Sequence, residues 1–368
     1  NCLKQGKNDV RICYSHHHNL NLHNIMASSE HCGKTMVVLN QYKSYGLPSV
    51  AEWYAANGGE VRLLYISEAS KSGFLSKKGL LREWTKAFFK WAVQPLTFRN
   101  RIVYCTSAQL PFMLICRLAG LALGDCRVYF HNFYLHELGR KPLVKRILRF
   151  LLADSRFTIL TQSEGEIEYY RALSSKVNLK FIPFCSDFTP VAKEDQRTAG
   201  LPDSYVFTGG YTNRDYPLMF RLAGRFPDRQ FVFVASSLNG IECPPSLDNV
   251  TLLYNLPKDQ FESILTGAEV VIVPLREDVG ASGQMLAISA ARNAKPVVYT
   301  DLSVISYFFS DGAGIPYRLG DLDSLSAGLH ALLSDSGLRE RCGRKALERS
   351  RNFTMDAQLP LLRDVMAL

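Results

Sequence analysis

Residues 35–67 contain the pattern that most narrows what this chain can fold into. An apolar run at residues 36–40 is followed by a polar loop, a segment of helical spacing at residues 47–57, two glycines and a second apolar run at residues 61–66. A strand, a helix and a strand in this order, with glycines ending the helix, predict a β-α-β unit with parallel strands.

The same alternation continues along the chain, so the predicted fold class is α/β. Further strands are predicted at residues 101–105, 126–130, 157–161, 179–183, 205–208, 230–235, 250–254, 269–274 and 296–300. The polar segment 193–204 is the predicted linker. We therefore expect two Rossmann-like doubly wound domains, over residues 35–190 and 205–350. Their ligand site is expected in a cleft that the carboxyl ends of the two sheets face.

The net charge of +9 is distributed unevenly. Residues 1–187 carry 25 basic and 13 acidic side chains, whereas residues 188–368 carry 18 and 21. A basic half and a mildly acidic half predict different partners for the two domains.

The pattern of apolar residues and cysteines indicates a cytoplasmic protein. No apolar run reaches the roughly 18 residues that a membrane-spanning helix needs, because Arg146, Arg149 and Asp154 interrupt the best candidate. No secretion-signal pattern is present, and the nine cysteines lack the paired spacing of a disulfide framework.

Residues 1–34 do not fit the α/β pattern. They hold five of the eight histidines together with Cys13 and Cys32. A metal site is one interpretation, but the spacing matches no strong zinc pattern, so we favour a mobile or surface-laid extension.

Two glycine-bearing turns in the second half have the composition of an anion site. In the first, Gly209-Gly210 follows a predicted strand, Arg214 lies in the same loop, and Asp215 is a plausible cap for the next helix. In the second, residues 277–298, the loop VGASG lies between a strand and a helix. The free N–H groups at a helix start favour anions, so the two turns together predict a diphosphate site. The Gly209-Gly210 turn does not match the GxGxxG fingerprint, and no acidic residue ends the next predicted strand, at residues 230–235. Both features disfavour a nicotinamide cofactor.

Several segments of the second half occur in an order that is typical of one enzyme family. FTGG and RDYP are followed by an apolar strand, NVTLLYNLPKDQFESILTGAEVVIVP, ASGQMLAISAARNAKPVV and GDLDSLSAGLHALLSD. This order resembles the nucleotide-sugar domain of GT-B glycosyltransferases, and most of all the retaining glycosyltransferase family four. The resemblance extends over residues 205–350, and over residues 35–187 only as a fold-level pattern.

The resemblance implies a donor site in the C-terminal domain. In the family, the ASGQ loop contacts the donor diphosphate through backbone amides, and the glycine turn and a basic residue contact it from the other side. The implied diphosphate-binding residues are Gly209, Gly210, Arg214, Ser282, Gly283 and Gln284. Asn255 and Leu256 would lie against the nucleotide base.

The chain departs from the family at two positions. Most members carry two glutamates eight positions apart, the first facing the donor sugar and the second the ribose. Those positions here hold Ala281 and Ser289. Ser289 remains able to hydrogen-bond a ribose hydroxyl, and Glu277 or Asp278 is a candidate contact for the donor sugar. A solvated-loop role for these two carboxylates is equally compatible with the sequence.

In the first domain, His131 follows a predicted strand and His136 lies five residues further on. A histidine at the end of a strand can act near an acceptor hydroxyl or a donor sugar, and the family often has a polar or histidine residue there. We therefore assign a catalytic role to His131 and place His136 and Gly46 on the acceptor side. A structural histidine and a plain turn are the alternatives for His131 and Gly46.

No constellation in the second domain predicts a metal site. Asp321 and Asp323 precede a helix and are typical of a helix cap. Positive charge at the leaving diphosphate would come from Arg214 and from helix starts. We expect a nucleotide sugar as co-substrate, and no metal or other cofactor.

Two segments of the first domain are basic and apolar. Residues 71–101 contain eight basic side chains and one acid, Glu83, interleaved with Leu, Phe and Trp, and residues 140–152 have the same character. Basic amphipathic helices rich in Trp and Phe bind anionic membrane surfaces. Core helices with a solvated basic face are the alternative, and no recognised motif supports nucleic acid.

These features together predict a GT-B glycosyltransferase of hexosyltransferase type. It would move a sugar from a UDP- or GDP-linked donor to a glycan or lipid-linked acceptor, with retention implied by the resemblance, in the cytoplasm and peripherally on the inner face of a membrane. Residues 351–368 would form a helix that crosses back to the first domain. Two alternatives stay open, which are a catalytically inactive module that binds a nucleotide sugar or glycan, and a nucleotide-sugar epimerase of the same fold.

Overall fold

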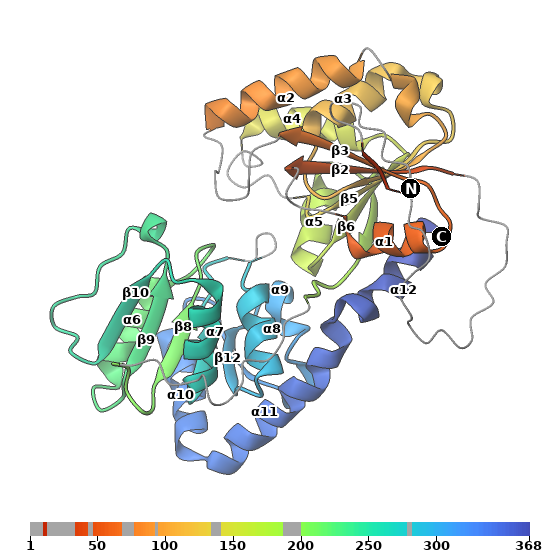
Figure 1. Cartoon of the computed structure of the whole chain (residues 1–368). Coiled ribbons are helices and arrows are strands. Elements are labelled where there is room, and N and C mark those ends of the chain that lie inside the picture. The colour runs from red at the N-terminus through yellow and green to blue at the C-terminus, as the bar shows by residue number, and fades with distance from the viewer. Residues whose placement is uncertain are drawn as a thin grey trace. The chain divides into compact units, whose positions relative to one another are not determined.

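The computed structural model describes residues 10–12, 34–42, 47–67, 77–92, 95–133, 141–186, 200–277 and 282–368. The chain divides into two compact units (Figure 1). Unit 1 comprises Asn1–Thr161, Glu166–Ile182 and Leu359–Leu368, and unit 2 comprises Gln162–Gly165 and Pro183–Gln358.

The sheet of unit 1 has seven strands in the order β1-β3-β2-β4-β5-β6-β7. They are β1 (Val10–Ile12), β2 (Met36–Tyr42), β3 (Val61–Ser67), β4 (Ile102–Cys105), β5 (Arg127–His131), β6 (Phe157–Thr161) and β7 (Asn178–Phe181). All pairs are parallel except the edge pair of β1 and β3. The strand order reverses between β2 and β4, which makes this pair the topological switch point of unit 1.

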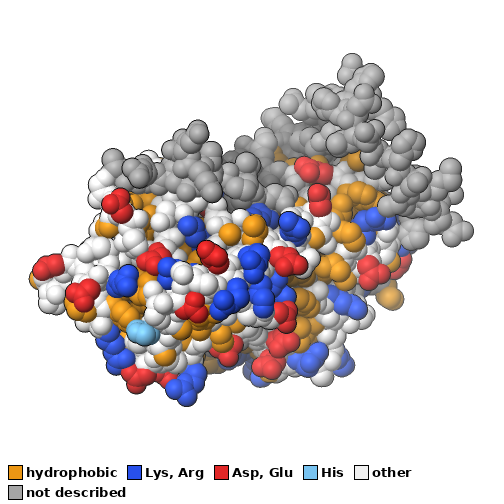
Figure 2. Space-filling view, turned by 90° about the horizontal axis from the view of Figure 1, so that it is seen from below, with side chains coloured by type: hydrophobic (Ala, Val, Ile, Leu, Met, Phe, Trp, Pro, Cys, Tyr) orange, Lys and Arg blue, Asp and Glu red, His pale blue; other side chains and the backbone are white. Residues whose placement is uncertain are grey.

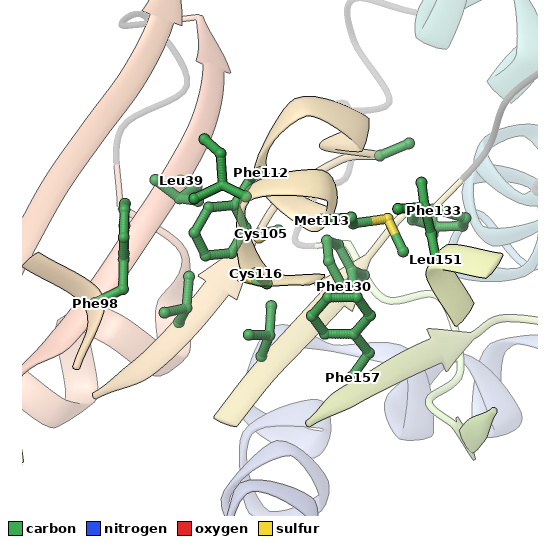
Figure 3. Close-up of a cluster of buried hydrophobic side chains, with 14 of the residues drawn as sticks. Leu39, Phe98, Cys105, Phe112, Met113, Cys116, Phe130, Phe133, Leu151 and Phe157 are labelled. Atoms are coloured by element: carbon green, nitrogen blue, oxygen red, sulfur yellow. The ribbon is translucent and has the colours of Figure 1, made fainter. Parts of the chain in front are cut away.

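Helices cover both faces of this sheet, which explains the almost unbroken apolar strands. They are α1 (Ser49–Ala56), α2 (Lys77–Ala92), α3 (Leu110–Ala119), α4 (Pro142–Leu152), α5 (Glu164–Leu173) and α12 (Met355–Met366). On one face, side chains of α2, α3, α4 and α5 form a single core with the strands, in which Phe112, Phe130 and Phe157 are fully buried (Figure 3).

The other face of the sheet is covered by α1 and by the end of α12. Leu362 and Met366 of α12 are buried in one core with residues of β2, β3 and β4. The Arg363 guanidinium carbon lies 4.0 Å from the centre of the Trp53 ring of α1. The last residues of the chain are thus part of the core of unit 1.

The sheet of unit 2 has six parallel strands in the order β10-β9-β8-β11-β12-β13. They are β8 (Val206–Gly209), β9 (Phe231–Ala235), β10 (Val250–Tyr254), β11 (Val270–Val273), β12 (Val297–Thr300) and β13 (Ile315–Tyr317). In chain order this is 3-2-1-4-5-6, the doubly wound arrangement of dinucleotide-binding domains. Its switch point lies between β8 and β11.

The helices of unit 2 also form two layers. They are α6 (Tyr216–Arg225), α7 (Lys258–Gly267), α8 (Gln284–Arg292), α9 (Ser303–Ser306), α10 (Leu322–Ser334) and α11 (Ser336–Ser350). Residues of α7, α8 and α9 share one core with the strands, and residues of α6 and α10 share the other. Short 3₁₀ turns are η2 (Pro95–Phe98), η3 (Gly120–Leu123), η6 (Ser237–Asn239), η7 (Ser310–Gly312) and η8 (Arg351–Phe353).

The predicted α/β fold class with two Rossmann-like units is confirmed, and the predicted strands are present with end shifts of one or two residues. Two short strands were not predicted. Residues 10–12, expected in a surface-laid extension, instead pair with β3, and the three-residue β13 contains a proline. Within the described ranges, no helix is long and apolar enough to cross a membrane.

Candidate functional site

The loops that follow β8 and β11 are tied together at the switch point of unit 2. Asn213 Nδ2 donates to the Glu277 carbonyl at 2.7 Å and to Ser282 Oγ at 3.0 Å. Arg214 forms a β-bridge with Leu275. Asn213 has φ +58, a left-handed conformation that asparagine tolerates better than most residues. The sequence-predicted glycine turns therefore form one joined structure, and Asn213, which sequence reasoning missed, connects them.

The first of these turns is shaped by its glycines. A Cβ at Gly209 would lie 2.6 Å from the Phe261 ring, and a Cβ at Gly210 would lie 2.6 Å from the Arg214 guanidinium. Gly210 also has φ +120, a backbone conformation that residues other than glycine rarely adopt. Asp215 caps α6 as predicted, because its carboxylate accepts from the Leu218 N–H at 3.1 Å.

Arg214 is a buried cation held by backbone carbonyls. Its side chain is 7% exposed, its Nε donates to the Gly209 carbonyl at 2.8 Å, and its Nη1 donates to the Thr212 carbonyl at 2.7 Å. Burial lowers the pKa of Arg214 to about 10. Within the described ranges, no carboxylate forms an ion pair with it. A buried charge without a counter-ion is costly, so this position favours an anionic ligand.

The second turn leads directly into α8. Gly283, at φ +84, is the residue before the helix, and a Cβ there would lie 2.8 Å from Ile305. The N-cap of α8 is Gly283 and not Ser282, whose buried hydroxyl accepts from Asn213. The first N–H groups of the helix have no partner within it and present a positive end to an anion.

The side chain of Gln284 is hydrogen-bonded to residues outside the two loops. It is buried, and its Nε2 donates to Tyr307 Oη at 3.1 Å and to the Gln162 carbonyl at 3.4 Å. Its Oε1 has no hydrogen-bond partner among the described residues. The side-chain amide nitrogen of Gln284 thus has partners within unit 2, and the backbone N–H of Gln284 lies at the start of α8.

Hydrogen bonds of two further amide side chains link this pair of loops to the loops that follow β9 and β10. Asn239 Nδ2, after β9, donates to the Tyr211 carbonyl after β8 at 2.8 Å. Asn255, after β10, donates from Nδ2 to Ser237 Oγ at 2.9 Å and accepts from the Ser237 N–H at 3.1 Å. The predicted base-side residue Asn255 thus belongs to the same linked set of loops as Arg214. Leu256 beside it is half-buried against the core.

Ser289 is engaged inside the unit. Its buried hydroxyl donates to Glu262 Oε1 of α7 at 2.7 Å. Burial raises the pKa of Glu262, and the bond from Ser289 opposes that rise. Ser289 therefore uses its one O–H on a carboxylate that sequence reasoning missed.

Of the two candidate sugar contacts, Glu277 is exposed and held through its carbonyl, and Asp278 lies outside the described residues.

In unit 1, His131 ends β5 and shares a hydrogen bond through Nδ1 with the Tyr104 hydroxyl. Burial lowers the pKa of His131 to about 4, so the imidazole is neutral at pH 7. Burial also raises the pKa of Tyr104, which keeps the phenol protonated. Gly46 and His136 lie outside the described residues.

A second polar group at the switch point of unit 1 was not predicted. Thr106 Oγ1, after β4, donates to Asn40 Oδ1 of β2 at 2.9 Å. Gln109 is fully buried and donates from Nε2 to Ser107 Oγ at 2.9 Å, and its Oε1 has no partner among the described residues. Buried polar atoms are nearly always hydrogen-bonded, so this oxygen marks the edge of the sheet as a candidate ligand surface.

The acidic side chains form no metal constellation in the part of the chain that the structure describes. Asp321 is the N-cap of α10 and accepts from the Asp323 and Ser324 N–H groups at 2.9 and 3.0 Å. Asp323 instead pairs with Arg225. Asp321 therefore has the capping role that the sequence predicted, whereas Asp323 lies inside the first turn of α10.

Comparisons with solved structures identify the fold. Sucrose-phosphate synthase from Thermosynechococcus elongatus superposes with a TM-score of 0.67 at 14% identity, over 91% of this chain and 100% of that one. The chain has the GT-B fold. A glycosyltransferase from Rickettsia africae gives a TM-score of 0.64 at 12% identity, over 90% and 98% of the two chains. HepE from Anabaena, solved in complex with UDP, gives 0.62 at 12% identity, over 90% and 99%.

No protein-family model matches the sequence, and no curated protein matches it significantly. The likeness to these solved structures therefore establishes the fold alone.

Proposed function

We propose that this chain is a glycosyltransferase that uses a nucleoside-diphosphate sugar. The observation that carries the proposal is Arg214, a buried guanidinium without a carboxylate partner in the described ranges, at the switch point of a doubly wound sheet. A diphosphate would supply the missing counter-ion, and the start of α8 would add backbone N–H donors.

The donor is proposed to lie across the linked loops of unit 2. Its diphosphate would contact Gly209, Gly210, Arg214 and the backbone after Ser282, and its base would lie near Asn255 and Leu256. The fold neighbour HepE was solved with UDP, which supports a uridine or related nucleotide here. Glu277 and Asp278 remain proposed contacts of the donor sugar.

In the proposed reaction, the acceptor oxygen forms a bond to the anomeric carbon of the sugar while the bond from that carbon to the diphosphate oxygen breaks. The electron pair of the broken bond stays on the diphosphate, and the proton of the acceptor hydroxyl is released. Charge on the leaving diphosphate would be stabilised by Arg214 and the start of α8, without a metal. Transfer of a hexose with retention of configuration is proposed from the family resemblance.

The acceptor is proposed to bind unit 1. Neutral His131 would contact the acceptor or the donor sugar, with Gly46 and His136 on the acceptor side. The basic helices α2 and α4 support an anionic membrane surface as a partner, and hence a glycan or a lipid-linked acceptor.

A thermal-shift screen with UDP, GDP, ADP and their sugar conjugates tests the proposal. We expect one nucleotide diphosphate to raise the melting temperature, and the same nucleotide sugar to be hydrolysed slowly in the absence of acceptor. A shift without donor hydrolysis would indicate a binding module, and interconversion of the sugar would indicate an epimerase. The absence of a shift with every nucleotide would refute the donor site.

A further inference from the structure

A groove of about 910 Å³ lies in unit 1 between α2, α3 and α4. These three helices lie on one face of the sheet (Figure 1). Its walls are almost entirely apolar, and the lining side chains include Trp84, Phe88, Phe89, Leu114, Ile147 and Phe150. A groove of this volume is large enough for a small-molecule ligand or part of a lipid.

The groove continues onto an exposed apolar surface. In α4, Leu148, Leu151 and Leu152 are buried in the core, whereas Leu143 is 70% and Phe150 is 52% exposed. Leu143, Ile147 and Phe150 follow a spacing of four and three residues, so they form a second apolar stripe on the same helix. Phe89 of α2, at 64% exposed, faces the same groove. Such a surface marks an interaction site on a soluble domain.

The three helices carry almost only positive charge. Their one acid, Glu83, is paired with Lys86 at 2.8 Å. Among the described residues, no carboxylate pairs with Lys145, Arg146 or Arg149 of α4, and Arg146 lines the groove. By contrast, acidic and basic side chains are interspersed on the face seen in Figure 2. An occupant of the groove must therefore combine an apolar body with negative charge.

We infer that the groove between α2, α3 and α4 binds one hydrocarbon chain of an anionic membrane lipid. The inference rests on the proposed membrane partner and states how unit 1 holds it. From Leu143 to Leu151 the groove follows eight residues of α4, or about 12 Å. The hydrocarbon part of one leaflet is about 15 Å thick, half of the roughly 30 Å of a bilayer. The groove thus accommodates most of one chain, while the cations of α4 lie within reach of lipid phosphate.

Trp84 provides a reporter inside the groove. Its indole Nε1 is buried and has no hydrogen-bond partner among the described residues. Vesicles of phosphatidylcholine and phosphatidylglycerol, with bromine placed either deep or shallow on the acyl chain, would quench its fluorescence by contact. We expect the full chain to show stronger quenching from the deep bromine, and Trp84→Phe to lose that difference while still binding vesicles.

Matched variants separate a lipid in the groove from adsorption to the surface. Leu114→Gln with Ile147→Gln changes two side chains that line the groove, and Leu96→Gln with Leu121→Gln changes two exposed leucines outside it. Leu121 is 97% exposed, so simple adsorption predicts that the outside pair weakens vesicle binding at least as much. We expect the inside pair to weaken binding about tenfold or more, and the outside pair less than about threefold.

Three results would overturn the inference. They are equal quenching by deep and shallow bromine, equal effects of the two variant pairs, and self-association that the inside pair alone abolishes, which would make a second copy the occupant. The nucleotide thermal shift is measured on the same proteins. If the vesicle experiments fail but a nucleotide still raises the melting temperature, the lipid groove is refuted and the proposed donor site is retained. If no nucleotide raises the melting temperature but the vesicle results are as expected, the donor site is refuted and the groove is retained.

Discussion

Replacing Arg214 by methionine should weaken nucleotide binding strongly and lower the free energy of unfolding of the free protein by less than about 3 kcal/mol. The substitution keeps the apolar stem and removes the charge. Burial lowers the pKa of Arg214 from its ordinary value to about 10, which corresponds to about 3 kcal/mol against the charged form. That penalty is fully present below about pH 10 and disappears as the pH rises from about 10 to 12.5. At neutral pH the methionine variant therefore does not carry this desolvation penalty.

The same substitution removes two hydrogen bonds, to the carbonyls of Gly209 and Thr212. Bonds from a charged donor contribute about 1.5–3 kcal/mol each, so losing both costs about 3–6 kcal/mol. Removal of the desolvation penalty of about 3 kcal/mol cancels this cost at the lower end of the range. We expect the free energy of unfolding of the variant to fall by less than about 3 kcal/mol. Loss of the contact to a diphosphate should weaken binding by about 2–4 kcal/mol, or roughly 30- to 1,000-fold in Kd.

The assay is thermal denaturation with and without the nucleotide found in the screen. At a concentration of about 100 times the wild-type Kd, the nucleotide stabilises the wild type by about 2.7 kcal/mol. A variant with 100-fold weaker binding would gain only about 0.4 kcal/mol under the same conditions. Urea denaturation of the free proteins gives the stability change separately.

Arg221→Met is the matched control, because Arg221 is an exposed arginine of the neighbouring helix α6. It should leave both quantities unchanged. The reasoning fails if Arg214→Met keeps the full nucleotide shift, or if it destabilises the free protein by far more than about 3 kcal/mol, since Arg214 would then be a structural residue.

Three further outcomes are expected. Gly210→Ala should destabilise the protein by about 2 kcal/mol or more in urea denaturation, because its φ of +120 and the nearby guanidinium both oppose a Cβ; an effect below about 0.5 kcal/mol would contradict this geometry. As pH falls from 6.5 to about 4, the unfolded chain is protonated before His131, so stability should fall by up to about 3 kcal/mol, and His131→Gln should remove this part of the pH dependence. Glu262 has a raised folded pKa, so stability should decrease as pH rises from 4.5 through that pKa; Ser289→Ala should strengthen this decrease and Glu262→Gln should abolish it, and a pH profile that neither variant alters would refute the pairing.

The fold was predictable because its strongest signals are local. Most predicted strands are apolar runs between turn residues, and helix covering on both faces keeps these runs nearly free of polar residues, whereas the edge strand β7 is largely exposed. The strand β13, with the sequence IPY, has neither the length nor the composition for such a signal. It forms because its neighbour β12 offers a free edge, which is a tertiary effect.

The site was predictable where backbone geometry carries it. Gly210 and Gly283 have positive φ angles, a conformation in which glycine is the usual residue, and both lie where the chain turns from a strand to a helix. Partner choice was not predictable in the same way. The sequence placed Ser289 on a helix, but only packing of α7 against α8 brings the Glu262 carboxylate to its hydroxyl. Asn213 likewise gave no local sign that its amide joins two loops distant in sequence.

The C-terminal helix has a consequence for how the protein is made. Leu362 and Met366 complete a core whose other fully buried members all precede residue 183. A nascent chain that contains all strands of unit 1 therefore has this face covered by α1 alone until residues 359–366 have been synthesised, whereas unit 2 has its own helices earlier in the chain. Stalled chains that lack residues 359–368 should be more sensitive to protease at the face under α1 and should depend on chaperones. Equal resistance of stalled and full-length chains would show that this face closes without the final helix.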